Sequence, residues 1–119
     1  MADPVKWGSE FLVNTTTSGA QFEPGVAALS NGGFVVTWTD LSLSADDSSG
    51  RAVRAQIFGE DGKAVGGEFL VNTSTTDNQE DPVVAGLANG GFVIAWVGPG
   101  TSNSSDVYFQ LYDGSCTPV

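Results

Sequence analysis

The chain repeats itself at a fixed interval. Phe-Leu-Val-Asn-Thr at residues 11–15 returns at residues 69–73, an offset of 58 (69 − 11). Asn-Gly-Gly-Phe-Val at residues 31–35 returns at residues 89–93 with the same offset. A repeat of this length predicts that the chain stacks two copies of one supersecondary unit. Any fold proposed for the sequence must therefore place equivalent residues in equivalent surroundings.

Each copy predicts short strands separated by turns. The predicted strands lie at residues 10–14, 25–29, 34–40, 51–58 and 68–72, with their equivalents following in the second copy. No helical period persists for two turns, so the predicted fold class is all-β. We expect one domain over residues 1–119, with repeat 1 at about 10–67, repeat 2 at about 68–114 and a tail at 115–119.

If each unit is taken to begin at the second predicted strand instead of the first, the chain divides into two four-stranded antiparallel units that look like propeller blades. The first strand of each unit has small side chains, Val-Ala-Ala-Leu at residues 26–29 and Val-Ala-Gly-Leu at residues 84–87. Small side chains suit the crowded axis of a propeller. The strands that follow carry Trp38 and Trp96 where a wedge-shaped blade widens, and for these residues core packing is favoured over ligand stacking.

Two blades cannot close a ring, because propellers use about four to eight. The second unit lacks its outermost strand, whereas the sequence from Glu10 to Asn14 supplies a spare one. We expect this spare strand to complete the second blade of a neighbouring copy, which gives a head-to-tail homo-oligomer closed by symmetry. A trimer with six blades is favoured over two or four chains. A piece of a longer repeat array and a compact two-sheet sandwich are the alternative arrangements.

Composition narrows the function classes. The 119-residue chain has 14 acidic residues, 4 basic residues and no His, for a formal charge of −10. Such a chain is repelled by nucleic acids and by anionic membranes, and no apolar run approaches the ~20 residues of a spanning helix. Nucleophile activation by imidazole is excluded, and the lone Cys116 forms no internal disulfide. We expect a non-enzymatic protein; a hydrolase using carboxylates alone is the enzymatic alternative.

Three motifs resemble a known repeat. They are Glu-Phe-Leu-Val-Asn-Thr at residues 10–15, Asn-Gly-Gly-Phe-Val-Val-Thr-Trp at 31–38 and Arg-Ala-Gln-Ile-Phe at 54–58. Together they look like the tandem repeat of large secreted bacterial surface proteins of the RTX type, and the resemblance covers nearly the whole chain. It implies a propeller-like adhesion module that is extracellular or on the bacterial cell surface. It carries over no calcium site, because the Gly-Gly-x-Gly-x-Asp pattern is absent.

The loops that differ between the copies mark the expected binding face. Residues 15–24, 41–50, 73–82 and 98–105 are predicted to lie at one end of the blades. Carbohydrate is the favoured ligand, since lectin sites combine aromatic surface with side-chain amides and carboxylates. The candidate ligand-binding residues are Phe22, Glu23, Asp40, Asp46, Asp47, Gln79, Glu80 and Asp81.

No cofactor and no metal site is expected. Clustered carboxylates such as Asp46 and Asp47 can ligate calcium, but solvated, solubilising acid is the favoured interpretation. The alternative to a carbohydrate-binding role is a structural repeat module from a longer secreted surface protein, with no small-molecule ligand.

Overall fold

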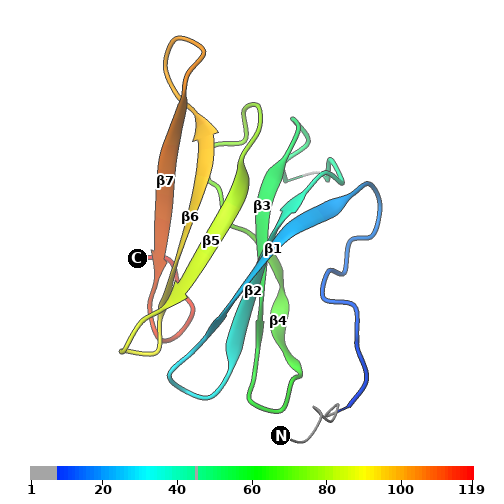
Figure 1. Cartoon of the computed structure of the whole chain (residues 1–119), viewed down its shortest axis with the longest axis vertical. Helices are drawn as coiled ribbons and strands as arrows, with labels where there is room; N and C mark the ends of the chain where they lie inside the picture. Colours follow the sequence, from blue (N-terminus) through cyan, green and yellow to red (C-terminus); the bar gives the residue numbers. More distant parts are fainter. Residues whose placement is uncertain (1–7, 45) are drawn as a thin grey trace, which may run out of the picture.

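The computed structural model describes residues 8–44 and 46–119, and all the regular structure in these residues is β. The strands are β1 (Gln21–Ala28), β2 (Phe34–Asp40), β3 (Ala52–Phe58), β4 (Ala64–Leu70), β5 (Glu80–Gly86), β6 (Phe92–Pro99) and β7 (Ser105–Tyr112). They form a four-stranded sheet in the order β1-β2-β3-β4 and a three-stranded sheet in the order β5-β6-β7, both antiparallel (Figure 1). The predicted all-β class is confirmed. The described residues include no helix able to span a membrane.

The repeated Asn-Gly-Gly motif forms the hairpins that open each sheet. Gly32 has a φ of 91°, which favours glycine, and the Leu29 N–H donates to the Gly33 carbonyl at 2.9 Å. The Asn31 side chain accepts a hydrogen bond from the Gly33 N–H at 2.9 Å, and Asn89 does the same for Gly91 at 3.0 Å. The same residues therefore build the same turn twice.

Both inner strands begin earlier than the predicted ranges. β1 starts at Gln21, which pairs with Asp40, and a bulge follows between Phe22 and Gly25. Glu23 occupies the bulge with a φ of 57°. The bulge absorbs Pro24, which has no N–H for the ladder, so pairing resumes beyond it. β5 contains the equivalent bulge between Glu80 and Val83.

The two sheets pack face to face through β5, which contacts β1, β2 and β3 (Figure 1). The inner strands approach closely, because a Cβ on Gly86 would lie 2.1 Å from the carbonyl oxygen of Ala28. Trp38 and Trp96 are 4% and 7% exposed, which confirms that both are packed inside. The buried core between the sheets includes Leu29, Val35, Val53, Ala55, Ile57, Val71, Phe92, Ile94, Trp96 and Tyr112.

Residues 10–14, which were predicted to pair with a neighbouring copy, form no strand in the single chain. A strand needs an edge to pair with, and this segment has none of its own. It lies against the first sheet instead, with the Phe11 ring 5.7 Å from the Phe58 ring (Figure 1). We call residues 10–14 the N-terminal segment.

Candidate functional site

A buried amide organises the end of the molecule where the longer loops meet. The Asn72 side chain accepts a hydrogen bond from the Val53 N–H at 2.8 Å. It donates to Asp47 at 2.8 Å and to Gln79 at 3.2 Å. Asp47 and Gln79 are 2% and 1% exposed, so all three polar side chains are satisfied within the chain. Asn72 thus joins both sheets to the loop after β2.

The same device recurs in the first repeat. The Asn14 amide donates to the Thr16 carbonyl at 2.8 Å and to Gln21 at 3.3 Å. Asn72 matches this with a 2.9 Å bond to the Ser74 carbonyl, in addition to its bond to Gln79. Each crossing into an inner strand is therefore fixed by an Asn–Gln pair.

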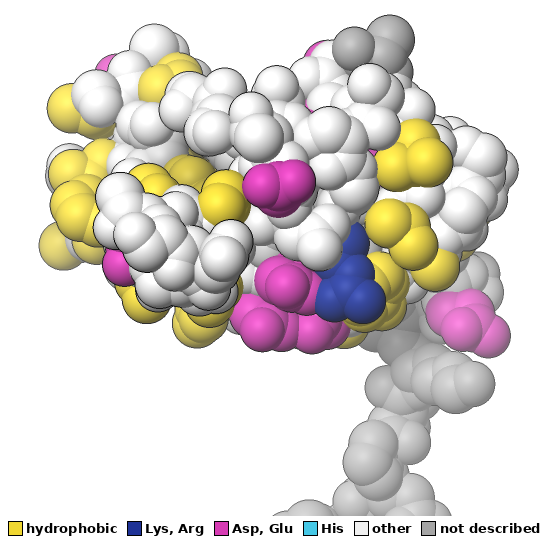
Figure 2. Space-filling view, turned by 90° about the horizontal axis from the view of Figure 1, so that it is seen from above, with side chains coloured by type: hydrophobic (Ala, Val, Ile, Leu, Met, Phe, Trp, Pro, Cys, Tyr) yellow, Lys and Arg dark blue, Asp and Glu magenta, His cyan; other side chains and the backbone are white. Residues whose placement is uncertain are grey.

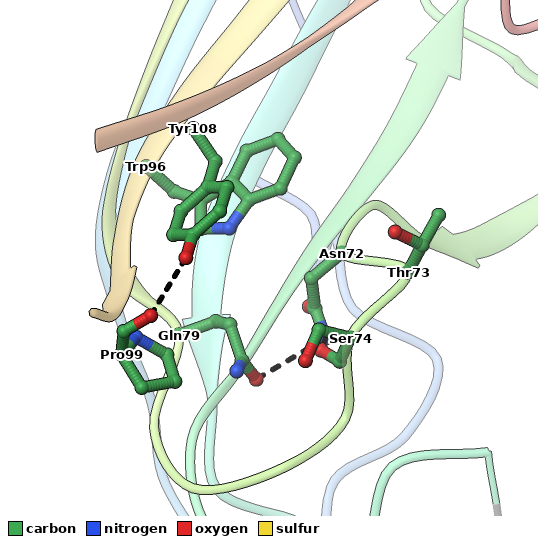
Figure 3. A pocket seen from close by; sticks show the side chains of 7 residues that line it. All are labelled: Asn72, Thr73, Ser74, Gln79, Trp96, Pro99 and Tyr108. Carbon is green, nitrogen blue, oxygen red and sulfur yellow. Dashed lines mark hydrogen bonds between the residues drawn. The ribbon is translucent and has the colours of Figure 1, made fainter. Parts of the chain in front are cut away.

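A small cavity of about 80 Å³ opens beside Asn72 (Figure 3). Its aromatic wall is formed by Trp96 and Tyr108, whose rings stack with centroids 6.2 Å apart. The Tyr108 hydroxyl donates to the Pro99 carbonyl at 2.6 Å, which fixes the ring (Figure 3). We call this cavity the Trp96 pocket. Its lining residues are Asn72, Thr73, Ser74, Gln79, Trp96, Pro99 and Tyr108.

An equivalent cavity of about 140 Å³ lies in the first repeat, which we call the Trp38 pocket. The indole N–H of Trp38 is buried and finds no hydrogen-bond partner among the residues that the structure describes. Indole nitrogen is only a donor, and leaving a buried donor unpaired costs about 1–3 kcal/mol. An acceptor on a ligand would satisfy it. The lining residues are Val13, Asn14, Gln21, Phe22, Pro24, Val36 and Trp38.

Two carboxyl groups meet where the inner strands bulge. Glu23 and Asp81 stand at equivalent positions, with φ values of 57° and 54°. Glu23 accepts a hydrogen bond from the Thr39 hydroxyl at 2.7 Å. A hydrogen bond between the two carboxyls lowers the pKa of Glu23, and contact with Glu23 raises the pKa of Asp81.

Arg51 neutralises part of the same surface. Its guanidinium forms an ion pair with Glu80 and lies 5.2 Å from the centre of the Phe22 ring. Figure 2 shows this end of the molecule with acidic side chains gathered beside basic ones. Phe22 is thus half-buried beneath a cation.

Asp40 and Asp46 are held by a second arginine. Asp40 is 1% exposed, and its carboxylate lies 3.0 Å from the Arg54 side chain. Asp46 also pairs with Arg54, and this hydrogen bond lowers the pKa of Asp46. These contacts tie the loop after β2 to β3.

The eight predicted ligand-binding residues are thus linked in one region, but through contacts within the chain. Asp40, Asp47 and Gln79 have buried, satisfied side chains, so they support the loops around the site. The pocket residues Asn72 and Tyr108 were not among the predicted binding residues; the recurrence of Asn in both copies was the available signal. No group of three or more His, Cys, Asp or Glu side chains positioned to hold a metal occurs in the part of the chain that the structure describes.

The fold and site define an all-β protein in which two repeats form two packed antiparallel sheets with matching aromatic pockets. Comparison with known proteins finds no matching family model, no matching curated protein and no matching solved structure.

Proposed function

We propose that this chain is a non-enzymatic, extracellular adhesion module that binds carbohydrate. The observation that carries the proposal is the repeated pocket, in which an indole lies beside an Asn–Gln pair at equivalent positions of both repeats. The exposed Tyr108 ring, backed by the buried Trp96 indole, offers the flat apolar surface on which a sugar ring stacks, and neighbouring polar groups orient its hydroxyls.

The Trp96 pocket supplies both kinds of contact. Trp96 and Tyr108 form its aromatic side, and the hydroxyls of Thr73 and Ser74 line the opposite side (Figure 3). A cavity of about 80 Å³ takes the edge of one sugar ring rather than a large ligand. Such a site is weak alone, so repetition of the pocket favours multivalent binding to a surface.

Repetition leads to the proposed assembly. Each sheet corresponds to one blade of a propeller, and three chains arranged head to tail would close a ring of six blades. A ring displays several pockets on one face, which suits attachment to a glycan-covered surface outside a bacterial cell. The resemblance to secreted surface-protein repeats favours the same location.

The second candidate is a structural repeat module without a small ligand. It is favoured by the burial of Asp40, Asp47 and Gln79, whose polar groups serve the fold itself. A calcium-bound form is not favoured for the same reason, since coordination would compete with these hydrogen bonds.

A glycan-array screen of the intact chain, followed by calorimetry on the strongest binder, tests the proposal. We expect Tyr108→Ala to weaken binding about ten-fold or more by removing the stacking surface. Leu43→Ala, an exposed apolar residue in the loop after β2, is the matched control. Light scattering on both variants checks that assembly is unchanged. An array with no binder contradicts the carbohydrate ligand and favours the structural role.

A further inference from the structure

We infer that the outer edge of β7 binds the N-terminal segment of a second copy of this chain as its fourth strand. The inference rests on the proposed head-to-tail ring and names the contact that holds it together. It follows from comparing two strands that are equivalent in sequence but differ in their surroundings.

The equivalent strands β3 and β7 differ sharply in exposure. Every residue of β3 is buried, including Val53 and Ala55, which are both 0% exposed. Their equivalents in β7, Val107 and Phe109, are 77% and 66% exposed. Figure 2 shows hydrophobic side chains gathered on the β7 side of the molecule. Val53 and Ala55 face the core between the two sheets, and β4 closes the edge of β3. β7 instead ends its sheet, and no third sheet covers its outward face in the described structure.

The open part of the β7 edge is short and well defined. The tail occupies one end of it, through a bridge between Tyr112 and Pro118 and a 2.9 Å bond from the Val119 N–H to the Leu111 carbonyl. Elsewhere in the described structure nothing pairs with this edge, so Val107 to Phe109 offer unpaired backbone groups. An edge of this kind is a template for another strand.

The covering strand in the first sheet has the same sequence as the N-terminal segment. Residues 68–72 and residues 10–14 both read Glu-Phe-Leu-Val-Asn. In the first sheet, Phe69 pairs with Ala55 and Leu70 pairs with Arg54. The same register on β7 places Phe11 opposite Phe109 and Leu12 opposite Tyr108. It uses the stretch of edge that the tail leaves open.

The N-terminal segment is already held where this pairing requires it. Phe69 pairs with β3 and also packs its ring 5.6 Å from Tyr112 of the next sheet, at an angle of 58°. Phe11 packs its ring 5.7 Å from Phe58 at 60°, which is the same contact one repeat earlier. Phe11 therefore makes the ring contact with the neighbouring sheet but has no strand to pair with in the described structure. It remains 58% exposed.

The polar ends of the segment match the same pattern. Asn72 accepts a hydrogen bond from the Val53 N–H, and Asn14 would accept one from the Val107 N–H of the second copy. Glu68 accepts hydrogen bonds from the Thr15 hydroxyl at 2.6 Å and the Thr16 N–H at 2.8 Å.

Glu10 would accept the equivalent bonds from Thr73 and Ser74 of the second copy. Because Thr73 and Ser74 line the Trp96 pocket, docking would also place a carboxylate at the rim of that pocket.

Light scattering on the full chain tests the inference. We expect a wild-type mass three times the 12.3 kDa of one chain. Phe109→Glu should weaken association about 30-fold or more, the loss typical of a central interface residue. Leu43→Glu adds the same charge at an exposed apolar residue in a loop and should associate like the wild type. Circular dichroism verifies that both variants are folded.

A cross-link tests the register. In a Cys116→Ser background, Phe11→Cys with Phe109→Cys should form a disulfide between chains under mild oxidation, and the ladder should end at three chains. Phe11→Cys with Leu43→Cys is the control and should give none. A monomeric wild type, normal association of Phe109→Glu, or failure of the first pair to cross-link would each overturn the inference.

Glycan binding separates this inference from the proposed function. A ring with this cross-link that binds no glycan contradicts the carbohydrate ligand and supports the docking. A monomer that binds glycans contradicts the docking and supports the carbohydrate ligand.

Discussion

Glu23 and Asp81 occupy the same place in the two repeats and face each other across the junction between the sheets. Their hydrogen bond lowers the pKa of Glu23, and the proximity of Glu23 raises the pKa of Asp81. A raised carboxyl pKa in the folded state contributes stability at low pH that is lost as pH rises through that pKa. A lowered pKa contributes stability at higher pH that is lost on acidification. The contributions of Glu23 and Asp81 to stability therefore change with pH in opposite directions. At neutral pH the negative charge of Asp81 repels that of Glu23 and destabilises the folded chain.

Replacing Asp81 with Asn should therefore raise the melting temperature at pH 7. An amide removes the negative charge and keeps a donor for the Glu23 carboxylate. The gain should shrink when the melt is repeated in acid, because Asp81 of the wild type takes up a proton as the pH falls. Asp61→Asn is the control, because it removes one charge from an exposed turn and leaves an acceptor for the Lys63 N–H. Thermal melts at both pH values measure the difference, and equal shifts for the two variants would contradict the pairing.

Asn72 offers a second prediction at this scale. Asn72→Ala removes the partner of the Val53 N–H and of two buried side chains, so we expect a loss of about 2–4 kcal/mol in unfolding free energy. Asn14→Ala should cost about 1 kcal/mol or less in chains diluted until they are monomeric, where Asn14 bonds only to Thr16 and Gln21. Urea denaturation of both variants makes the comparison. Similar losses would show that Asn72 does not join the sheets.

At the scale of the elements, the sequence pattern predicted most of the strands. β2 agrees with the predicted range 34–40, because a hairpin motif and a polar loop bound it. The N-terminal segment, predicted to pair with a neighbouring copy, forms no strand in the single chain, since an apolar run of strand-forming residues folds as a strand only beside an edge. The burial of Asp40 also lay beyond sequence reasoning: it depends on Arg54, 14 residues away along the chain.

The close approach of β1 and β5 gives a prediction about packing. Gly86→Ala places a Cβ against the Ala28 carbonyl, and relieving this overlap should cost about 1–3 kcal/mol. Gly67→Ala in β4 has no atom within 4 Å of the new Cβ and is the matched control. Thermal unfolding compares the two variants. Equal stability would mean that the sheets separate easily at their inner strands.

At the scale of the whole molecule, charge opposes the proposed assembly. Each chain carries a formal charge of −10, so copies repel each other over a distance set by the ionic strength. We expect association to tighten as NaCl is raised from about 20 mM to about 200 mM, over which the Debye length falls about three-fold. Sedimentation at several salt concentrations measures this. Association that weakens with salt would indicate an interface dominated by ion pairs instead of strand pairing.

Gly86 has a counterpart in the first repeat, and that counterpart is Ala28. When a second copy docks, the junction between chains must accommodate a methyl group that the junction within a chain does not contain. In the proposed ring, closely packed interfaces within chains would then alternate with wider interfaces between chains, so the central opening would have three-fold and not six-fold symmetry. On heating or dilution, such a ring would dissociate at the interfaces between chains into intact two-bladed monomers before any blade unfolds.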